Sequence, residues 1–244
     1  MNETLTTLTF PWRDHLKGLA DALKNFIFPP VCVSCKKVGA LLCANCYGRV
    51  QWLAEPLCPQ CGRIVTAPPS PCPSCRKRPL PLIKIRAATQ FVDPVPQIIH
   101  QMKYNGYHAL AEPLAGFMVK AWPQWQFDVN LVIPVPLHPD RQKKRGYNQA
   151  ALIAKHLCRQ LSLPGNPKAV SRIRHTPPQV GLSAADRLTN VHGAFRADAA
   201  VVAGKQILLI DDVCTTGATM AAVAEALLAA GAKTVSGYSA ARAV

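Results

Sequence analysis

Residues 207–219 read ILLIDDVCTTGAT, and this stretch decides the fold of the chain. Its first four residues are apolar and predict a buried strand, yet two adjacent carboxylates follow at once. Because side chains alternate across a strand, Asp211 and Asp212 would point to opposite faces unless the backbone turns there. We therefore expect the strand to end at these acids, and the acids to face a ligand.

A loop of small and hydroxylated residues, Thr215 to Thr219, follows the acids and leads into a helix expected over residues 218–230. Backbone N–H groups and hydroxyls converge at such a helix N-terminus and form a phosphate cradle. Together with two carboxylates that suit a vicinal diol or a metal, the loop describes a site for a ribose 5-phosphate. The alternative, an Asp-Asp turn that only caps a helix, needs one carboxylate and no such loop.

Strand patterns and helix patterns alternate through the rest of the second half of the chain. Strands are expected at residues 85–91, 128–135, 201–210 and 234–239, and helices at 95–104, 109–122, 148–161 and 218–230. This alternation predicts an α/β fold in which helices flank a parallel sheet. Such sheets bind ligands beyond the carboxyl ends of their strands, where the acids and the loop are expected.

Two further segments extend the pattern. Residues 133–150 read IPVPLHPDRQKKRGYNQA, and residues 174–195 read RHTPPQVGLSAADRLTNVHGAF. Residues 207–219 resemble the signature of type I phosphoribosyltransferases, and the three segments together resemble the ComF/GntX family over nearly all of residues 30–244. The resemblance implies a type I phosphoribosyltransferase fold preceded by a double zinc-ribbon module.

The resemblance also implies a ligand, phosphoribosyl pyrophosphate (PRPP) or a related sugar phosphate, bound with Mg²⁺. Asp211 and Asp212 would fix the ribose, and the 5-phosphate would lie on Thr215, Thr216, Gly217, Ala218 and Thr219. Arginine grips a diphosphate through paired contacts that lysine cannot reproduce. For Lys103, a phosphate contact and an exposed helix end are equal alternatives. The candidates for the pyrophosphate or for a lid are Lys103, Arg141, Arg145, Arg174, Gln179 and Arg187.

Eight of the ten cysteines form four pairs with two residues between the members of each pair. Two such knuckles complete a tetrahedral Cys₄ zinc site, so four knuckles predict two structural zinc ions. Disulfides need an oxidising compartment, for which the sequence gives no sign. Successive pairing closes shorter loops than alternate pairing, and we favour it. The ligands would be Cys32, Cys35, Cys43 and Cys46 for one ion, and Cys58, Cys61, Cys72 and Cys75 for the other.

A change of composition around Pro79-Leu80-Pro81 predicts the domain organisation. We expect an N-terminal helical segment over residues 1–29, the double zinc-ribbon module over 30–80 and the phosphoribosyltransferase-like domain over 82–244. Residues 15–28 place apolar side chains on one helical face. We interpret this short stripe as a helix docked on its own domain rather than as a membrane anchor.

The chain is strongly basic, with 28 Lys and Arg against 13 Asp and Glu, and a formal net charge of +15. Residues 141–175 alone hold nine bases and no acid. This charge favours polyanionic partners such as nucleic acid, phosphorylated substrates or an acidic membrane surface. No apolar run approaches the roughly 18 residues that a membrane span requires, and no targeting segment is visible, so we expect a cytoplasmic protein.

These features support two main functional hypotheses of different classes and a weaker third, an adaptor to uptake machinery whose DNA affinity would be negligible. The ComF/GntX resemblance implies a DNA-handling protein, used in transformation or in the use of external DNA as a nutrient. Single-stranded DNA would bind across the basic surface, and DNA-uptake or recombination machinery would be further partners, since zinc ribbons also serve as docking surfaces. The alternative is a phosphoribosyltransferase of nucleobase salvage that releases pyrophosphate from PRPP. The residues specify neither a catalytic group nor an acceptor base.

Overall fold

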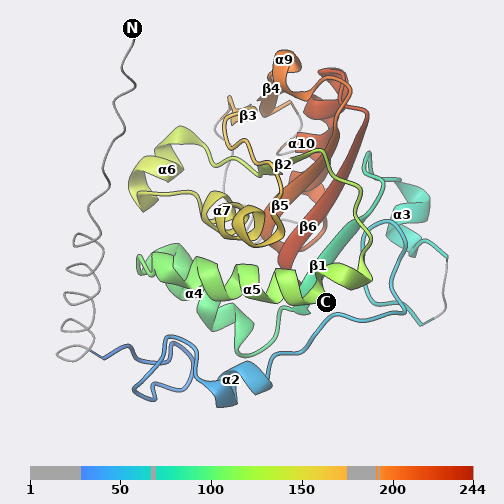
Figure 1. Ribbon diagram of the computed structural model, residues 1–244. Helices are drawn as coiled ribbons and strands as arrows, with labels where there is room; N and C mark the ends of the chain where they lie inside the picture. The colour runs from blue at the N-terminus through green and yellow to red at the C-terminus, as the bar shows by residue number, and fades with distance from the viewer. Residues whose placement is uncertain (1–28, 67–69, 175–190, 192, 244) are drawn as a thin grey trace, which may run out of the picture.

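The computed structural model of the chain describes residues 29–66, 70–174, 191 and 193–243 (Figure 1). Its centre is a sheet of four parallel strands in the order β1-β6-β5-β2. The strands are β1 (Ile85–Gln90), β6 (Thr234–Arg242), β5 (Gln206–Cys214) and β2 (Leu131–Pro134). Helices cover both faces, which confirms the predicted parallel sheet flanked by helices.

The apolar run at the start of β5 builds the two halves of the core. Because side chains alternate along a strand, Ile207 and Leu209 join one hydrophobic cluster, and Leu208 and Ile210 join the other. The first cluster includes α10 (Ala218–Ala229). The second contains three helices that Figure 1 shows gathered on one side of the sheet: α4 (Val95–Tyr104), α5 (Ala111–Ala121) and α7 (Gln149–Leu161).

The β1 edge of the sheet is covered by residues of the cysteine-rich part of the chain. Trp52 lies opposite Thr89 in an antiparallel bridge. The Leu53 amide donates to the Ala88 carbonyl at 3.0 Å, and the Gln90 amide donates to the Gln51 carbonyl at 2.8 Å. An edge strand with unpaired backbone groups is a liability for aggregation, and this pairing removes it from β1.

Shorter elements surround the sheet. Two 3₁₀ turns, His108–Leu110 and Trp122–Gln124, flank α5. A small antiparallel sheet pairs β3 (Val170–Arg172) with β4 (Phe195–Ala197). Four short helices complete the described elements: α2 (Ala44–Gly48), α3 (Pro73–Lys77), α6 (Pro139–Arg145) and α9 (Ala199–Val202).

Two expectations about β5 are wrong. The strand does not begin near residue 201, because the Asp198 side chain caps α9 by accepting from the Ala200 amide at 3.0 Å, and Gly204 turns the chain at φ 70°. Nor does it end at the acids. Pairing with β6 continues to Cys214, which lies opposite Arg242, so both acids are part of the strand.

The remaining helix and strand predictions agree in position, with shifted ends. The expected helix at 95–104 matches α4, and Asn148 caps α7 by accepting from the Ala150 amide at 3.0 Å. The helix expected over 15–28 lies outside the described residues, and the domain limits stay predictions. No helix in the described part of the chain is both long and apolar enough to cross a bilayer.

Candidate functional site

A cavity of about 400 Å³ lies at the carboxyl ends of β5 and β2. Its walls come from segments far apart in the sequence: the end of α4, the segment after β2, α6, the start of α7, β3, the end of β5 and the start of α10. The charged side chains that line it are Lys103, Arg141, Arg145, Arg172, Asp211 and Asp212. The cavity occupies the edge where parallel sheets bind ligands.

Both acids reach the cavity although the strand continues past them. β2 pairs with β5 only as far as Pro134, which lies opposite Ile210. The last four residues of β5 therefore have no β2 residue beside them in the ladder, and this side of the strand opens into the cavity. The two carboxylates bond locally instead: Asp211 accepts from the Asp212 amide at 2.9 Å, and Asp212 accepts from the Val213 amide at 2.7 Å.

The two acids have different electrostatic surroundings. Asp212 Oδ2 lies 2.7 Å from Lys103 Nζ, and the two side chains are 9% and 25% exposed. Burial and the adjacent Asp212 carboxylate raise the pKa of Asp211 to about 7. At neutral pH Asp211 is thus partly protonated, and a cation or a diol in the cavity would favour the ionised form.

The loop between β5 and α10 has the shape of a phosphate cradle. Gly217 caps α10 with φ 83°, a left-handed conformation that glycine adopts without strain. A Cβ atom at this position would lie 2.9 Å from Ile85 Cδ1. Thr216 Oγ1 accepts from the Ala218 amide at 3.3 Å. The α10 N-terminus therefore opens toward the cavity, where its dipole favours an anion.

Arg242 supports this loop from the buried side. Its side chain is 1% exposed, and Nη1 donates to Cys214 Sγ at 2.8 Å and to the Thr215 carbonyl at 2.5 Å. The same guanidinium lowers the pKa of the Cys61 thiol, although burial has the larger, opposite effect and raises it to about 11. Arg242 thus lies between the loop and one cysteine cluster.

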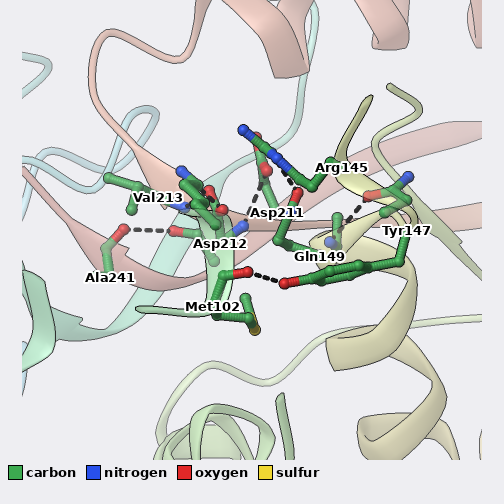
Figure 2. A network of polar contacts seen from close by, with 12 residues as sticks. Met102, Arg145, Tyr147, Gln149, Asp211, Asp212, Val213 and Ala241 are labelled. Atoms are coloured by element: carbon green, nitrogen blue, oxygen red, sulfur yellow. Dashed lines mark hydrogen bonds and ion pairs between the residues drawn. The ribbon is translucent and has the colours of Figure 1, made fainter. Parts of the chain in front are cut away.

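Three arginines, Arg141, Arg145 and Arg172, line the cavity and form its arginine wall. Arg145 Nη1 donates to Gln149 Oε1 at 2.6 Å, and Tyr147 donates its hydroxyl to the Met102 carbonyl (Figure 2). Burial and the nearby Arg141 and Arg174 lower the pKa of Arg172 to about 10. Several cations held this close together favour a polyanionic ligand such as a diphosphate.

The structure brings most of the predicted site residues together. Nine of them line the cavity: Lys103, Arg141, Arg145, Asp211, Asp212, Thr215, Gly217, Ala218 and Thr219. Thr216 and Arg174 are not among its lining residues, and Gln179 and Arg187 lie outside the described residues. Their roles toward PRPP stay predictions.

Arg172 and Gln149 line the cavity but were not predicted as site residues. Arg172 comes from β3, and its signal was its place in the acid-free basic stretch 141–175. Gln149 is 2% exposed, and its amide nitrogen has no acceptor among the described residues. A buried donor of this kind is costly unless a ligand satisfies it.

The eight paired cysteines form two clusters with the successive pairing. Cys32, Cys35, Cys43 and Cys46 make the first cluster, and Cys58, Cys61, Cys72 and Cys75 the second, with the sulfur atoms of each within 4.8 Å of one another. Four thiols at this spacing fit a tetrahedral zinc ion. Burial opposes ionisation of Cys58, but backbone N–H groups of Cys61 and Cys72 lower its pKa to about 6.

Comparison with known proteins agrees with both parts of the molecule. A model described as phosphoribosyl transferase domain matches residues 147–241, and one described as double zinc ribbon domain matches residues 23–77. The DNA utilization protein YhgH of Salmonella typhimurium is 32% identical over 85% of this chain and 94% of its own length. The chain belongs to the ComF/GntX family.

Two other relatives carry competence names. Competence protein F of Haemophilus influenzae is 30% identical over 83% of this chain and 90% of its own length. Competence protein ComFC of Bacillus subtilis is 28% identical over 78% of this chain and 79% of its own length. This ComF/GntX protein therefore combines a type I phosphoribosyltransferase fold with two structural zinc sites, as the sequence predicts.

Proposed function

We propose that this ComF/GntX protein binds PRPP, or a related sugar phosphate, together with single-stranded DNA, and that it serves the uptake or utilisation of external DNA. One observation carries the proposal: a single cavity holds paired acids, a phosphate-type loop at a helix N-terminus and an arginine wall. The names of the relatives, DNA utilization protein and competence protein, support the DNA role.

Each part of the cavity has a place in this proposal. Asp211 and Asp212 bind the ribose hydroxyls, and the loop over residues 215–219 binds the 5-phosphate through its backbone N–H groups. Arg141 and Arg145 bind the pyrophosphate. Bound Mg²⁺ would neutralise part of the diphosphate charge, and the cavity offers it the carboxylates that this ion prefers.

The basic surface supports the nucleic-acid part. α6 carries exposed Lys143 and Lys144 beside the cavity arginines, in a stretch that contains no acid between residues 141 and 175. Lys and Arg along a groove attract a single strand through its phosphates, with strong dependence on salt. The proposal places the protein in the cytoplasm, where an incoming strand would meet it and the uptake or recombination machinery.

Isothermal titration calorimetry with PRPP and Mg²⁺ tests the ligand part. We expect saturable binding to the wild-type protein. Asp212→Asn should bind at least about tenfold more weakly, a loss of about 1.4 kcal/mol, because the variant lacks a carboxylate that is proposed to bind the ribose hydroxyls. Asp198→Asn is the matched control, because asparagine also caps a helix and Asp198 lies outside the cavity. If the wild-type protein does not bind PRPP in the presence of Mg²⁺, the proposed ligand is wrong.

A second function, phosphoribosyl transfer, is favoured by the way the cavity provides for both ends of PRPP. The arginine wall would offset the charge of a leaving pyrophosphate, and the loop would hold the sugar in place. Pyrophosphate release with a panel of nucleobases tests this function. Release above the rate without base supports a salvage enzyme, and binding of PRPP without release leaves the DNA-handling role.

A further inference from the structure

A second hollow of about 550 Å³ adjoins the PRPP cavity. It lies between the first cysteine cluster, which contributes Val33 and Lys36, and one side of α4. Phe91, Lys103 and Tyr104 line both hollows. We call this second hollow the α4 groove. A ligand in the proposed sugar-phosphate site would therefore lie directly beside the α4 groove.

We propose that the α4 groove binds a nucleobase of single-stranded DNA. This inference rests on the proposed function and names the place where the strand contacts the protein. Tyr104 is 64% exposed, more than any other described tyrosine, so its ring is accessible to a base. Bases of any sequence stack on such rings, because every base has a flat π-face.

The Tyr104 ring lies beside two other side chains, His100 and Arg145. The His100 ring lies 4.8 Å from it, centroid to centroid, at an interplanar angle of 47°. Arg145 Cζ lies 5.6 Å from the Tyr104 centroid, within the range of a cation–π contact. His100 and Tyr104 are one helical turn apart on α4, so they present a continuous aromatic surface along the groove.

The charge of the groove suits the backbone of a strand. Its lining includes two lysines and no acidic residue. Lys103 is paired with Asp212, whereas Lys36 Nζ, within the described part of the chain, donates to the Val33 carbonyl at 3.2 Å. Lys36 is exposed, so its side chain can contact a phosphate that lies along the groove. The C-terminal end of α4, at Lys103, contacts Asp212 of the PRPP cavity.

The position of α4 gives the groove a link to the other ligand. Lys103 contacts Asp212 inside the PRPP cavity, and its chain neighbour Tyr104 is part of the aromatic surface. A base on Tyr104 and a sugar phosphate on Asp212 would share one end of one helix. The strand and PRPP thus bind next to each other, with their negative groups close together.

Fluorescence anisotropy with labelled oligo(dT), in the absence of PRPP, tests the groove. Stacking contributes about 1–3 kcal/mol per base, so His100→Ala and Tyr104→Leu should each bind at least about fivefold more weakly than the wild-type protein. Tyr107→Ala is the matched control, because Tyr107 is 45% exposed and does not line the groove; it should bind as the wild type does. A strand with abasic sites in place of bases should not distinguish the variants.

The outcomes separate the groove from the function on which it rests. If oligo(dT) binds the wild type but binds His100→Ala equally well, the groove proposal is overturned and the DNA role stands. If the variants lose as much affinity for the abasic strand as for oligo(dT), the groove does not bind a base by stacking. If the wild type binds no strand at low salt, the DNA role itself fails. His100 does not line the PRPP cavity, so retained PRPP binding by His100→Ala shows that this variant is folded.

Discussion

Lys103 Nζ lies 2.7 Å from Asp212 Oδ2 and joins the end of α4 to β5 inside the cavity. Burial opposes the charge on Lys103, but the Asp212 carboxylate outweighs this effect and raises the pKa of the lysine. Lys103 therefore stays protonated at neutral pH. Lys103 pairs with Asp212 and not with Asp211. Asp211 is therefore the carboxylate whose charge we expect to respond to a ligand.

Removing the lysine should destabilise the fold. Lys103→Met leaves the Asp212 carboxylate in a buried place without its partner, and we expect a loss of about 3 kcal/mol in the free energy of unfolding. Arg159→Met breaks the exposed Arg159–Glu112 pair, whose side chains are 67% and 62% exposed, and should cost less than about 1 kcal/mol. Urea unfolding measures both. Equal losses would show that burial of the Lys103 pair is unimportant.

Asp211→Asn should stabilise the ligand-free protein in a pH-dependent way. The pKa of Asp211 is about 7 in the fold and about 4 in an unfolded chain. The native state holds the proton more tightly, so the wild type loses stability as pH rises between these values. At pH 8 the variant should be more stable by on the order of 4 kcal/mol, because each of the three pKa units is worth about 1.4 kcal/mol, and the gain should fall to about 2 kcal/mol at pH 5.5. Unfolding at both pH values checks this, and a gain independent of pH contradicts it.

The phosphate-type loop depends on glycine at one position. Gly217→Ala places a Cβ at φ 83° and 2.9 Å from Ile85 Cδ1, which should cost about 1–3 kcal/mol and weaken PRPP binding. Gly116→Ala is the matched control in the middle of α5, where an added Cβ meets nothing within 4 Å; it should stabilise by up to about 1 kcal/mol. Thermal unfolding and calorimetry with PRPP compare the two variants.

The two zinc sites should differ in how fast they release metal. Cys35 of the first cluster is exposed and Cys43 is partly buried, whereas all four cysteines of the second are buried. A chelator should remove zinc in two phases, the faster one from the first cluster. In Cys35→Ser, three thiolates and a hydroxyl hold zinc less well, so the first site should contain no zinc before the chelator is added. The fast phase should therefore be absent from this variant. A single phase that empties both sites at one rate would refute this difference.

The parallel sheet and nine of the cavity residues were predictable because their signals are local. An apolar run, adjacent acids and a hydroxylated loop indicate a strand that leads into α10, and the spacing of four cysteine pairs indicates the two metal clusters. The end of β5 was not predictable from the acids. It depends on β6, which continues to Arg242, and on β2, which stops at Pro134. Both are properties of neighbouring strands.

The ion pair and the groove depend on tertiary contacts as well. The sequence places Lys103 near the end of a helix, but only the packing of α4 against the sheet brings it to Asp212. α6 was missed as a helix because its residues read as a polar segment, although Pro139 at its start and the His138 side chain, which accepts from the Asp140 amide, are typical of a helix N-terminus. Arg172 reaches the cavity through β3, whose pairing with β4 joins residues distant in sequence.

A titration of labelled single-stranded DNA, followed by fluorescence anisotropy at several salt concentrations with and without Mg²⁺ and PRPP, tests whether the protein links the two ligands. We expect binding that weakens steeply as salt rises and that PRPP weakens further, because the two proposed sites would hold the two anions side by side. Binding unaffected by saturating PRPP would contradict linked sites, and no binding at low salt would contradict the DNA role.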